Sequence, residues 1–410
     1  MDCDGCPAAW HRLAKCMDMR KLRSWLVISS AGLLVSVAAA EEPSSSGEAP
    51  AKAPAERASR FIDPEDGQFD LSYFLENPRG FLPIPIIITE PAVGYGGGVA
   101  GMFLQPRREA GQEGWARPDI SGVGVFGTQN GTWGAFAGDA RLWLEGRLKT
   151  LVGAGTGRVN LDFYGAGLNL PVLDRGVRYS LQFSGAVAQA SWQVAPKSPW
   201  WVGLRYVYAD VDPTLRDDAI FPGLADAVRV KVSAPTAILE YDSRDNVFTP
   251  TQGIYAEASY LTSRSSLGAS DNFDRFQQLL TGWVPLQSKL TFGARGNYAW
   301  SSSGTPFFLQ PYIVLRGVPA VRYQGDQAAS AELELRWQFH ERWSVVGFGG
   351  AGATRTSRSD DVLRQSVGSG GAGFRYELAR KFGLNAGIDV AHSPGTTAIY
   401  FVVGNAWFRP

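Results

Sequence analysis

The stretch Gln310–Gln327, QPYIVLRGVPAVRYQGDQ, places one arginine among apolar residues. A buried guanidinium without a partner is costly, so Arg316 needs a carboxylate elsewhere in the chain. Gly317 permits close backbone approach or a positive φ, and Pro319 fixes the chain just beyond it. We therefore expect a rigid bend that presents Arg316. The alternative is a surface loop with one solvated arginine.

A second polar stretch, DSRDNVFTPTQG, is rich in residues that form turns: Asp242, Arg244, Asp245, Asn246, Pro250 and Gly253. The acidic and amide side chains can bond nearby backbone groups, the proline starts the next element, and the glycine allows a bend into a strand. Oxygen atoms of this kind also bind calcium, but the stretch lacks the glutamate and spacing of an EF-hand. We expect a structural turn and no metal.

An enzyme needs a nucleophile and a base, and the sequence offers few candidates. His340 lies beside a predicted turn, and His392 and Ser393 are neighbours that point to opposite faces of a strand. No G-x-S-x-G elbow is present, and GYGGGVAG at 94–101 precedes no helix, so it predicts no phosphate loop. We expect neither enzymatic activity nor a cofactor.

The overall charge points to no charged partner. The 410 residues carry 39 basic and 39 acidic side chains, which favours neither nucleic acid nor a strongly acidic partner. After the first forty positions no run of 18 apolar residues occurs, which excludes a helical transmembrane bundle there.

The N-terminal forty residues have the order of a secretory signal peptide. Basic residues precede the apolar run Trp25–Val37, and small residues and then acidic ones follow it. We interpret 1–40 as an over-extended start plus signal peptide. All three cysteines, Cys3, Cys6 and Cys16, lie in this segment, so the remaining chain has no thiol. Residues 41–80 are expected to form a disordered linker and a short periplasmic segment.

From residue 81 to 410 the sequence alternates small or polar residues with apolar or aromatic ones in segments of about ten residues. This period predicts strands with two different faces. The expected strands are 82–89, 93–104, 117–128, 131–146, 148–165, 176–190, 199–212, 227–242, 252–264, 273–285, 288–301, 328–339, 342–354, 368–379, 382–392 and 396–408.

Two all-β folds compete for this pattern. A soluble sandwich or propeller would need two domains and a linker for so many strands, and no linker is visible. A transmembrane antiparallel β-barrel turns its apolar face to lipid and closes with an even number of strands. The signal peptide and the thiol-free body favour a barrel of about 16 strands in the bacterial outer membrane, in contact with lipid and lipopolysaccharide.

The two polar stretches together resemble the barrel domain of the BamA/TamA-type outer-membrane assembly and translocation superfamily. LRGVPAVRYQGDQ is similar to the family's sixth-loop motif, here Leu315, Arg316, Gly317 and Val318. EYDSRDNVFTPTQGIYAEAS is similar to its turn signature, and GAGFRYEL with GLNAGIDVA resembles its penultimate strands. The chain closes on an aromatic strand, as barrel proteins do.

The resemblance implies that the sixth extracellular loop folds inward and that its arginine pairs with lumenal carboxylates. Glu332 and Glu334 share one face of the following strand, and the family's acidic position resembles Glu332. We expect a charge-assisted pair between Arg316 and Glu332. The alternative is that both glutamates only solvate a wet lumen. Gly349 and Gly350 stand where the family often has an acidic residue.

The resemblance also implies a function in outer-membrane protein assembly or polypeptide translocation, through a weak seam between the first and last strands. Expected partners are nascent outer-membrane or secreted polypeptides and a separate periplasmic protein, because 41–80 are too short to hold a POTRA domain. Pro83, Pro85, Pro91 and Gly404 would weaken pairing at the seam. The competing hypothesis is a passive pore for small solutes, constricted by the loop.

Overall fold

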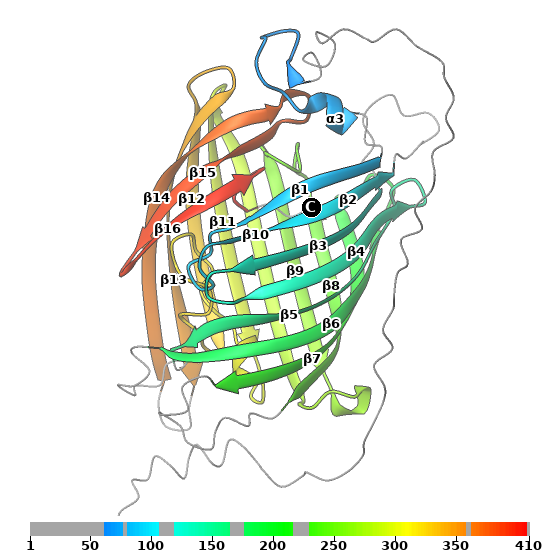
Figure 1. Cartoon of the computed structure of the whole chain (residues 1–410), viewed down its shortest axis with the longest axis vertical. Coiled ribbons are helices and arrows are strands. Elements are labelled where there is room, and N and C mark those ends of the chain that lie inside the picture. The colour runs from blue at the N-terminus through cyan, green and yellow to red at the C-terminus, as the bar shows by residue number, and fades with distance from the viewer. Residues whose placement is uncertain are drawn as a thin grey trace, which may run out of the picture. The chain divides into compact units, whose positions relative to one another are not determined.

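In the computed structural model, residues 61–76, 80–105, 119–164, 176–215, 229–357 and 362–407 are described. They form one sheet of sixteen strands, each antiparallel to its neighbour in the chain, which curls into a barrel (Figure 1). The strands are β1 Gly80–Ile88, β2 Gly96–Gln105, β3 Asp119–Thr128, β4 Trp133–Trp143, β5 Leu148–Phe163, β6 Val177–Gln193, β7 Trp200–Leu215, β8 Val230–Asp242, β9 Gly253–Ser263, β10 Phe273–Gln287, β11 Leu290–Ser301, β12 Gln327–Gln338, β13 Trp343–Ser357, β14 Val362–Ala379, β15 Leu384–Ser393 and β16 Thr396–Val403.

Alternation along the strands gives the sheet two different faces, and β12 shows an apolar outer face and a polar inner face most clearly. On β12, Leu333 and Trp337 are about half exposed on the outer face, whereas the alternating residues Glu332, Glu334 and Arg336 are buried. Side chains of successive strand residues point to opposite faces, so a period of two sorts them this way. The inner residues line a lumen into which loop residues pack beside β12–β15, and the outer apolar residues form the surface that a transmembrane barrel turns to lipid.

Most strands begin and end within three residues of their expected positions, and β14 and β16 differ more. β7 continues to Leu215, and β14 begins at Val362, so both are longer than expected. β16 ends at Val403, where the expected strand ran to residue 408. Gly404 has a φ of +79°, and the chain turns there out of the sheet. The interpretation of the closing residues as an aromatic strand is therefore corrected: Trp407 is buried off the strand.

The first and last strands lie next to each other without pairing. Along its other edge, β1 pairs with β2 over its whole length, including Pro83 and Pro85. Among the described residues, β1 and β16 share no hydrogen-bonded ladder, although they are in contact. Proline has no N–H to donate, which suits an edge strand. We call this junction the seam.

The end of the barrel where β1 begins and β16 ends is called the terminal end, and the opposite end is called the loop end. The N-terminal segment, residues 61–76, lies at the terminal end beside β14 and includes the short helix α3, Ser72–Glu76 (Figure 1). Three 3-10 turns, η3 Ser265–Leu267, η4 Phe307–Leu309 and η5 Arg380–Phe382, complete the described elements. No helix in these residues is long and apolar enough to cross a membrane. The expected signal peptide and linker lie outside the described residues.

Candidate functional site

Loop 6, residues 302–326, connects β11 to β12 at the loop end and turns back into the lumen. Its two arms pair with each other: the Ile313 amide donates to Tyr323 O, and the Gly325 amide donates to Pro311 O. Ile313, Leu315 and Val318 are buried together against Val367 of β14. This apolar contact, with the paired arms, holds the loop as a defined hairpin inside the barrel.

Arg316 lies at the inner end of loop 6 and is surrounded by carboxylates. Its Nε donates to Glu332 Oε1 at 3.0 Å, and its backbone N–H donates to Glu332 Oε2 at 3.2 Å. Its Nη2 lies 2.9 Å from Glu332 Oε1 and 2.9 Å from Glu334 Oε2, which are ionic contacts rather than aligned hydrogen bonds. The structure therefore brings together Arg316, Glu332 and Glu334, all buried.

A third carboxylate, Asp389 of β15, was not anticipated from the sequence. It is fully buried and accepts from Arg316 Nη1 at 2.8 Å. The Arg375 guanidinium of β14 also donates to Asp389, at 2.5 and 2.9 Å. A lone aspartate between Ile388 and Val390 in a strand cannot face lipid cheaply, and that signal could have located it. Asp389 on β15 supplies a carboxylate that Gly349 and Gly350 of β13 cannot supply.

Aromatic rings close the cluster on its other sides. The Arg316 guanidinium carbon lies 3.5 Å from the centre of the Phe348 ring, close enough for a cation–π contact. The Trp407 indole N–H donates to Glu332 Oε1 at 2.6 Å, and the ring packs on Trp283. The chain after β16 thus contacts the same carboxylate as loop 6, a contact that the expected closing strand 396–408 did not include.

Glycines in β13 make room for the inward loop. A Cβ on Gly350 would meet Leu315 Cδ2 at 2.9 Å and the Ala331 carbonyl at 2.5 Å. A Cβ on Gly352 would meet Ile313 Cγ2 at 2.5 Å. These positions face the lumen where the loop packs, so the glycine-rich sequence of β13 permits close approach of loop 6.

Loop 6 also bonds to both sides of the seam. On the β15–β16 side, the Gly317 amide donates to the Tyr400 hydroxyl at 2.9 Å, and Ser393 Oγ donates to Gly317 O at 2.7 Å. On the β1–β2 side, the Ala320 amide donates to Glu90 Oε1 at 3.0 Å. Gly317 has a φ of +88°, which is the bend that the sequence predicted. Loop 6 therefore spans the seam at the loop end.

The turn between β8 and β9 lies at the terminal end and is held by its own polar groups. Asp242 accepts from the Arg244 guanidinium, and Asp245 accepts from the Thr251 and Gln252 amides. Although burial raises the pKa of Asp245, hydrogen bonds from Thr251 and the backbone outweigh it and hold that pKa below its usual value.

Other members of the turn motif reach neighbouring elements. Asn246 donates to Phe382 O at 2.8 Å, and Pro250 O accepts from Arg336 Nη2 at 2.7 Å. Gly253 has a φ of +101°, and a Cβ there would lie 2.3 Å from Ser243 O. The motif thus ties the turn to η5 and to the lumen wall.

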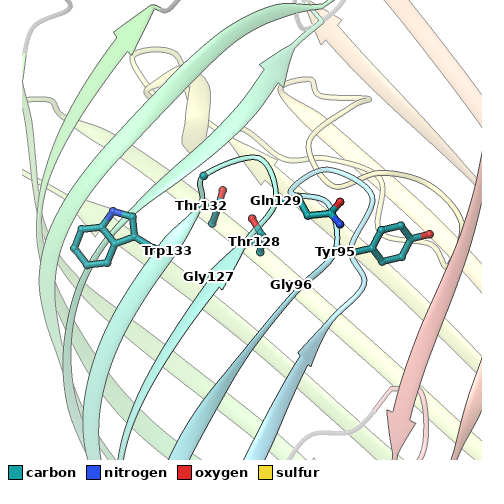
Figure 2. A pocket seen from close by; sticks show the side chains of 8 residues that line it. Tyr95, Gly96, Gly127, Thr128, Gln129, Thr132 and Trp133 are labelled. Carbon is teal, nitrogen blue, oxygen red and sulfur yellow. The ribbon is translucent and has the colours of Figure 1, made fainter.

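Two hollows lie apart from the Arg316 cluster. One is at the loop end between the β1–β2 and β3–β4 turns, with Trp133 and Tyr95 at its two sides and no charged side chain in its lining (Figure 2). The other is at the terminal end and joins the turn motif residues Asp245 and Asn246 to Arg336 and Arg342. His392 and Ser393 face opposite sides of β15: the former is exposed and the latter buried against loop 6.

The fold matches solved outer-membrane barrels. BamA from Haemophilus ducreyi, lacking POTRA domains 1–3, aligns with a TM-score of 0.53 at 12% identity, covering 79% of this chain and 69% of that one. CdiB from Escherichia coli aligns with a TM-score of 0.54 at 10% identity, covering 87% of this chain and 72% of that one. CdiB from Acinetobacter baumannii aligns with a TM-score of 0.52 at 10% identity, covering 79% of this chain and 59% of that one. No protein-family model and no curated protein sequence matches the chain. By its structure, the chain has the sixteen-stranded barrel fold of BamA and CdiB.

Proposed function

We propose that this chain is an outer-membrane barrel that inserts or translocates other polypeptides through the seam between β1 and β16, without enzymatic chemistry. The observation that carries the proposal is the seam itself: two adjacent strand edges without a ladder, crossed at the loop end by loop 6. Unpaired N–H and C=O groups on a strand edge can pair with an incoming strand. A client polypeptide that adds a strand there would use these groups.

In the proposed mechanism, the contacts of Arg316 keep loop 6 attached to β12 and β15 while the seam opens. Opening the seam only requires the contacts that cross it to break, such as the hydrogen bond between Ala320 and Glu90. The buried contacts of Arg316 with β12 and β15 stay on one side. We therefore expect loop 6 to remain with β12–β16 while β1 moves.

A disulfide across the seam tests this mechanism. Ile86 of β1 is half-buried on the inner face, and Val402 of β16 is buried on the same face, whereas Val403 points outward. In a background with the three N-terminal cysteines replaced by serine, Ile86→Cys with Val402→Cys is oxidised in lipid vesicles. The rate at which a second, urea-unfolded barrel protein inserts is then measured.

Insertion is expected to fall to the rate of protein-free vesicles under oxidation and to recover on reduction. The matched control is Val390→Cys with Ile399→Cys, which joins directly opposed residues of the paired strands β15 and β16. That lock should leave insertion unchanged. Undiminished insertion with the Ile86–Val402 lock formed would reject the seam mechanism.

A further inference from the structure

The N-terminal segment, residues 61–76, is a small docked structure at the terminal end. Ile62 and Phe69 form an isolated bridge, the Asp70 amide donates to Phe61 O, and the chain then enters α3. Leu71, just before α3, and Leu75, within it, pack against Ala379, Phe382 and Leu384 of the barrel. The segment is thus folded on the barrel wall.

A buried arginine fixes the segment in place. Arg342, in the turn between β12 and β13, has no exposed side-chain surface and contacts the carboxylates of Asp63, Asp66 and Asp70. Asp70 also accepts from the Arg380 amide at 3.0 Å. Because three carboxylates contact one guanidinium from different directions, this attachment is more specific in geometry than a single surface salt bridge.

The docked segment leaves an aromatic and aliphatic patch exposed. Phe61, Ile62, Phe69 and Tyr73 each keep between 41% and 45% of their surface accessible. The Phe61 ring stacks on Phe69 at 6.1 Å and lies 4.8 Å from Phe74, so the patch is one cluster rather than scattered side chains. A cluster of this kind on a rigid base indicates a contact surface.

The patch continues the outer aromatic surface of the barrel. The Tyr376 hydroxyl of β14 donates to Phe69 O at 2.7 Å. The Tyr376 ring packs on Trp343 of β13 at 4.9 Å, and Trp343 also contacts Phe374. These three rings lie on the outward face at the terminal end, where a transmembrane barrel carries its aromatic girdle. A surface that binds a protein partner does not need to adjoin the lipid-facing aromatic residues of the barrel, so the position of the patch favours lipid.

We propose that residues 61–76 form an interfacial anchor, in which Phe61, Ile62, Phe69 and Tyr73 enter the headgroup region of the periplasmic leaflet next to β14. The occupant is phospholipid. This inference rests on the proposed membrane location and adds a lipid-binding element outside the barrel. The amphipathic ring of Tyr73 favours this interface, and the apolar side chains of Phe61, Ile62 and Phe69 suit the apolar face of an interfacial element, which is buried about 5–10 Å into the headgroup boundary.

Fluorescence quenching by brominated lipid tests the anchor. Single-cysteine variants Phe69→Cys and Tyr73→Cys of the full chain, in the serine background, carry an environment-sensitive dye in vesicles of phosphatidylethanolamine and phosphatidylglycerol. We expect quenching at both positions, stronger for bromines near the headgroup than for bromines deep in the acyl chains. Glu65→Cys, whose parent side chain is 75% exposed, should stay unquenched.

A further variant separates failure of the anchor from failure of the membrane barrel. Leu333→Cys, on the outer face of β12, should be quenched by deep bromines if the barrel spans the bilayer. Quenching at Leu333 with water-like emission at Phe69 and Tyr73 would overturn the anchor and assign the patch to a protein partner. Absence of quenching at Leu333 would overturn the membrane location. Arg342→Gln should release the segment and lower quenching at Phe69 but not at Leu333.

Discussion

At the scale of single residues, Arg316 is held more firmly than one ion pair would hold it. Three buried carboxylates, from β12 and β15, surround one guanidinium, with an aromatic ring on its face. Desolvating charges is costly, and excellent geometry with several hydrogen bonds is needed to repay the cost. The arrangement meets that condition for Arg316, while Asp389 also accepts from Arg375 and Glu332 also accepts from Trp407.

Arg316→Ala should therefore destabilise the folded barrel by about 3–5 kcal/mol, the usual cost of removing one partner of a buried ion pair. Loop 6 should also become open to protease. Urea unfolding, followed by the gel mobility of the folded barrel, measures the first effect. Arg322→Ala is the matched control, since Arg322 in the same loop bonds the neutral Thr396 hydroxyl and is partly exposed. Equal losses in the two variants would contradict this account.

The sequence was informative about part of this cluster. A lone arginine in an apolar stretch, followed by two glutamates on one strand face, pointed to Arg316, Glu332 and Glu334. Asp389 lies 73 positions beyond Arg316, and local spacing does not say which strand of a closed sheet comes to face a loop. Trp407 was expected within the last strand, 396–408, and its position inside the barrel follows the turn of the chain at Gly404.

At the scale of elements, the glycines of β13 and the hairpin of loop 6 are complementary. Gly350→Ala should shift Leu315 or the backbone of β12 and destabilise the barrel by about 1–3 kcal/mol, as overpacking does. Gly347→Ala, on the outer face of the same strand, meets nothing within 4 Å and should change stability little. Urea unfolding of the two variants side by side is the measurement. Closely similar midpoints would show that loop 6 does not pack tightly on β13.

Docking of the N-terminal segment should depend on pH. A hydrogen bond from Arg342 holds the pKa of Asp66 below its usual value. Burial raises the pKa of Asp70, but bonds from Ser72, Arg380 and Arg342 outweigh it and lower that pKa as well. The docked state thus binds fewer protons than the free segment, so its stabilisation is present above about pH 3.9 and is lost as pH falls through the lowered pKa values.

Hydrogen exchange of residues 61–76 between neutral pH and pH 3 checks this expectation, after correction for the intrinsic pH dependence of exchange. Protection should decrease towards acid in the native chain. In Arg342→Gln it should be low at every pH. Protection that persists unchanged at low pH would mean that the apolar contacts of Leu71 and Leu75 suffice to hold the segment.

The sequence predicted a short segment here but not its docking. Asp63, Asp66 and Asp70 are ordinary in a solvated acidic stretch, and Arg342 is ordinary in a turn. Only the tertiary contact, across more than 270 positions, makes them one cluster. The turn between β8 and β9 was easier to predict from the sequence, because Asp245, Asn246 and Gly253 act mainly on backbone groups close in sequence.

At the scale of the whole molecule, the seam and the loop packed inside the lumen bear on the choice between a translocating barrel and a passive pore. Period-two alternation predicted the strand number and the two faces of the sheet, because every strand repeats the same physical requirement. It did not predict which segments enter the lumen, namely loop 6 and the residues after β16. With loop 6 packed inside, a permanently open pore is not the expected state.

Planar-bilayer recording should accordingly show low conductance in the native chain. Arg316→Ala should raise it or make it fluctuate, because loop 6 loses its attachment while the strands remain. A variant with residues 311–325 replaced by a short glycine-serine linker should conduct steadily. A large, steady conductance in the native chain would favour the passive pore, with loop 6 as a constriction.

The hydrogen bond between Trp407 and Glu332 has a consequence for the order of folding. It joins residues 75 positions apart, and the contact of Arg316 with Asp389 spans nearly as many. Contacts between residues far apart in sequence pay a large loop-closure entropy and form slowly. Loop 6 therefore reaches its final set of partners only after β15 and the residues behind β16 have arrived. Loop 6 is therefore fully packed only when the barrel is complete. A chain stalled or cut before Trp407 would have a mobile loop 6 that proteases can cleave.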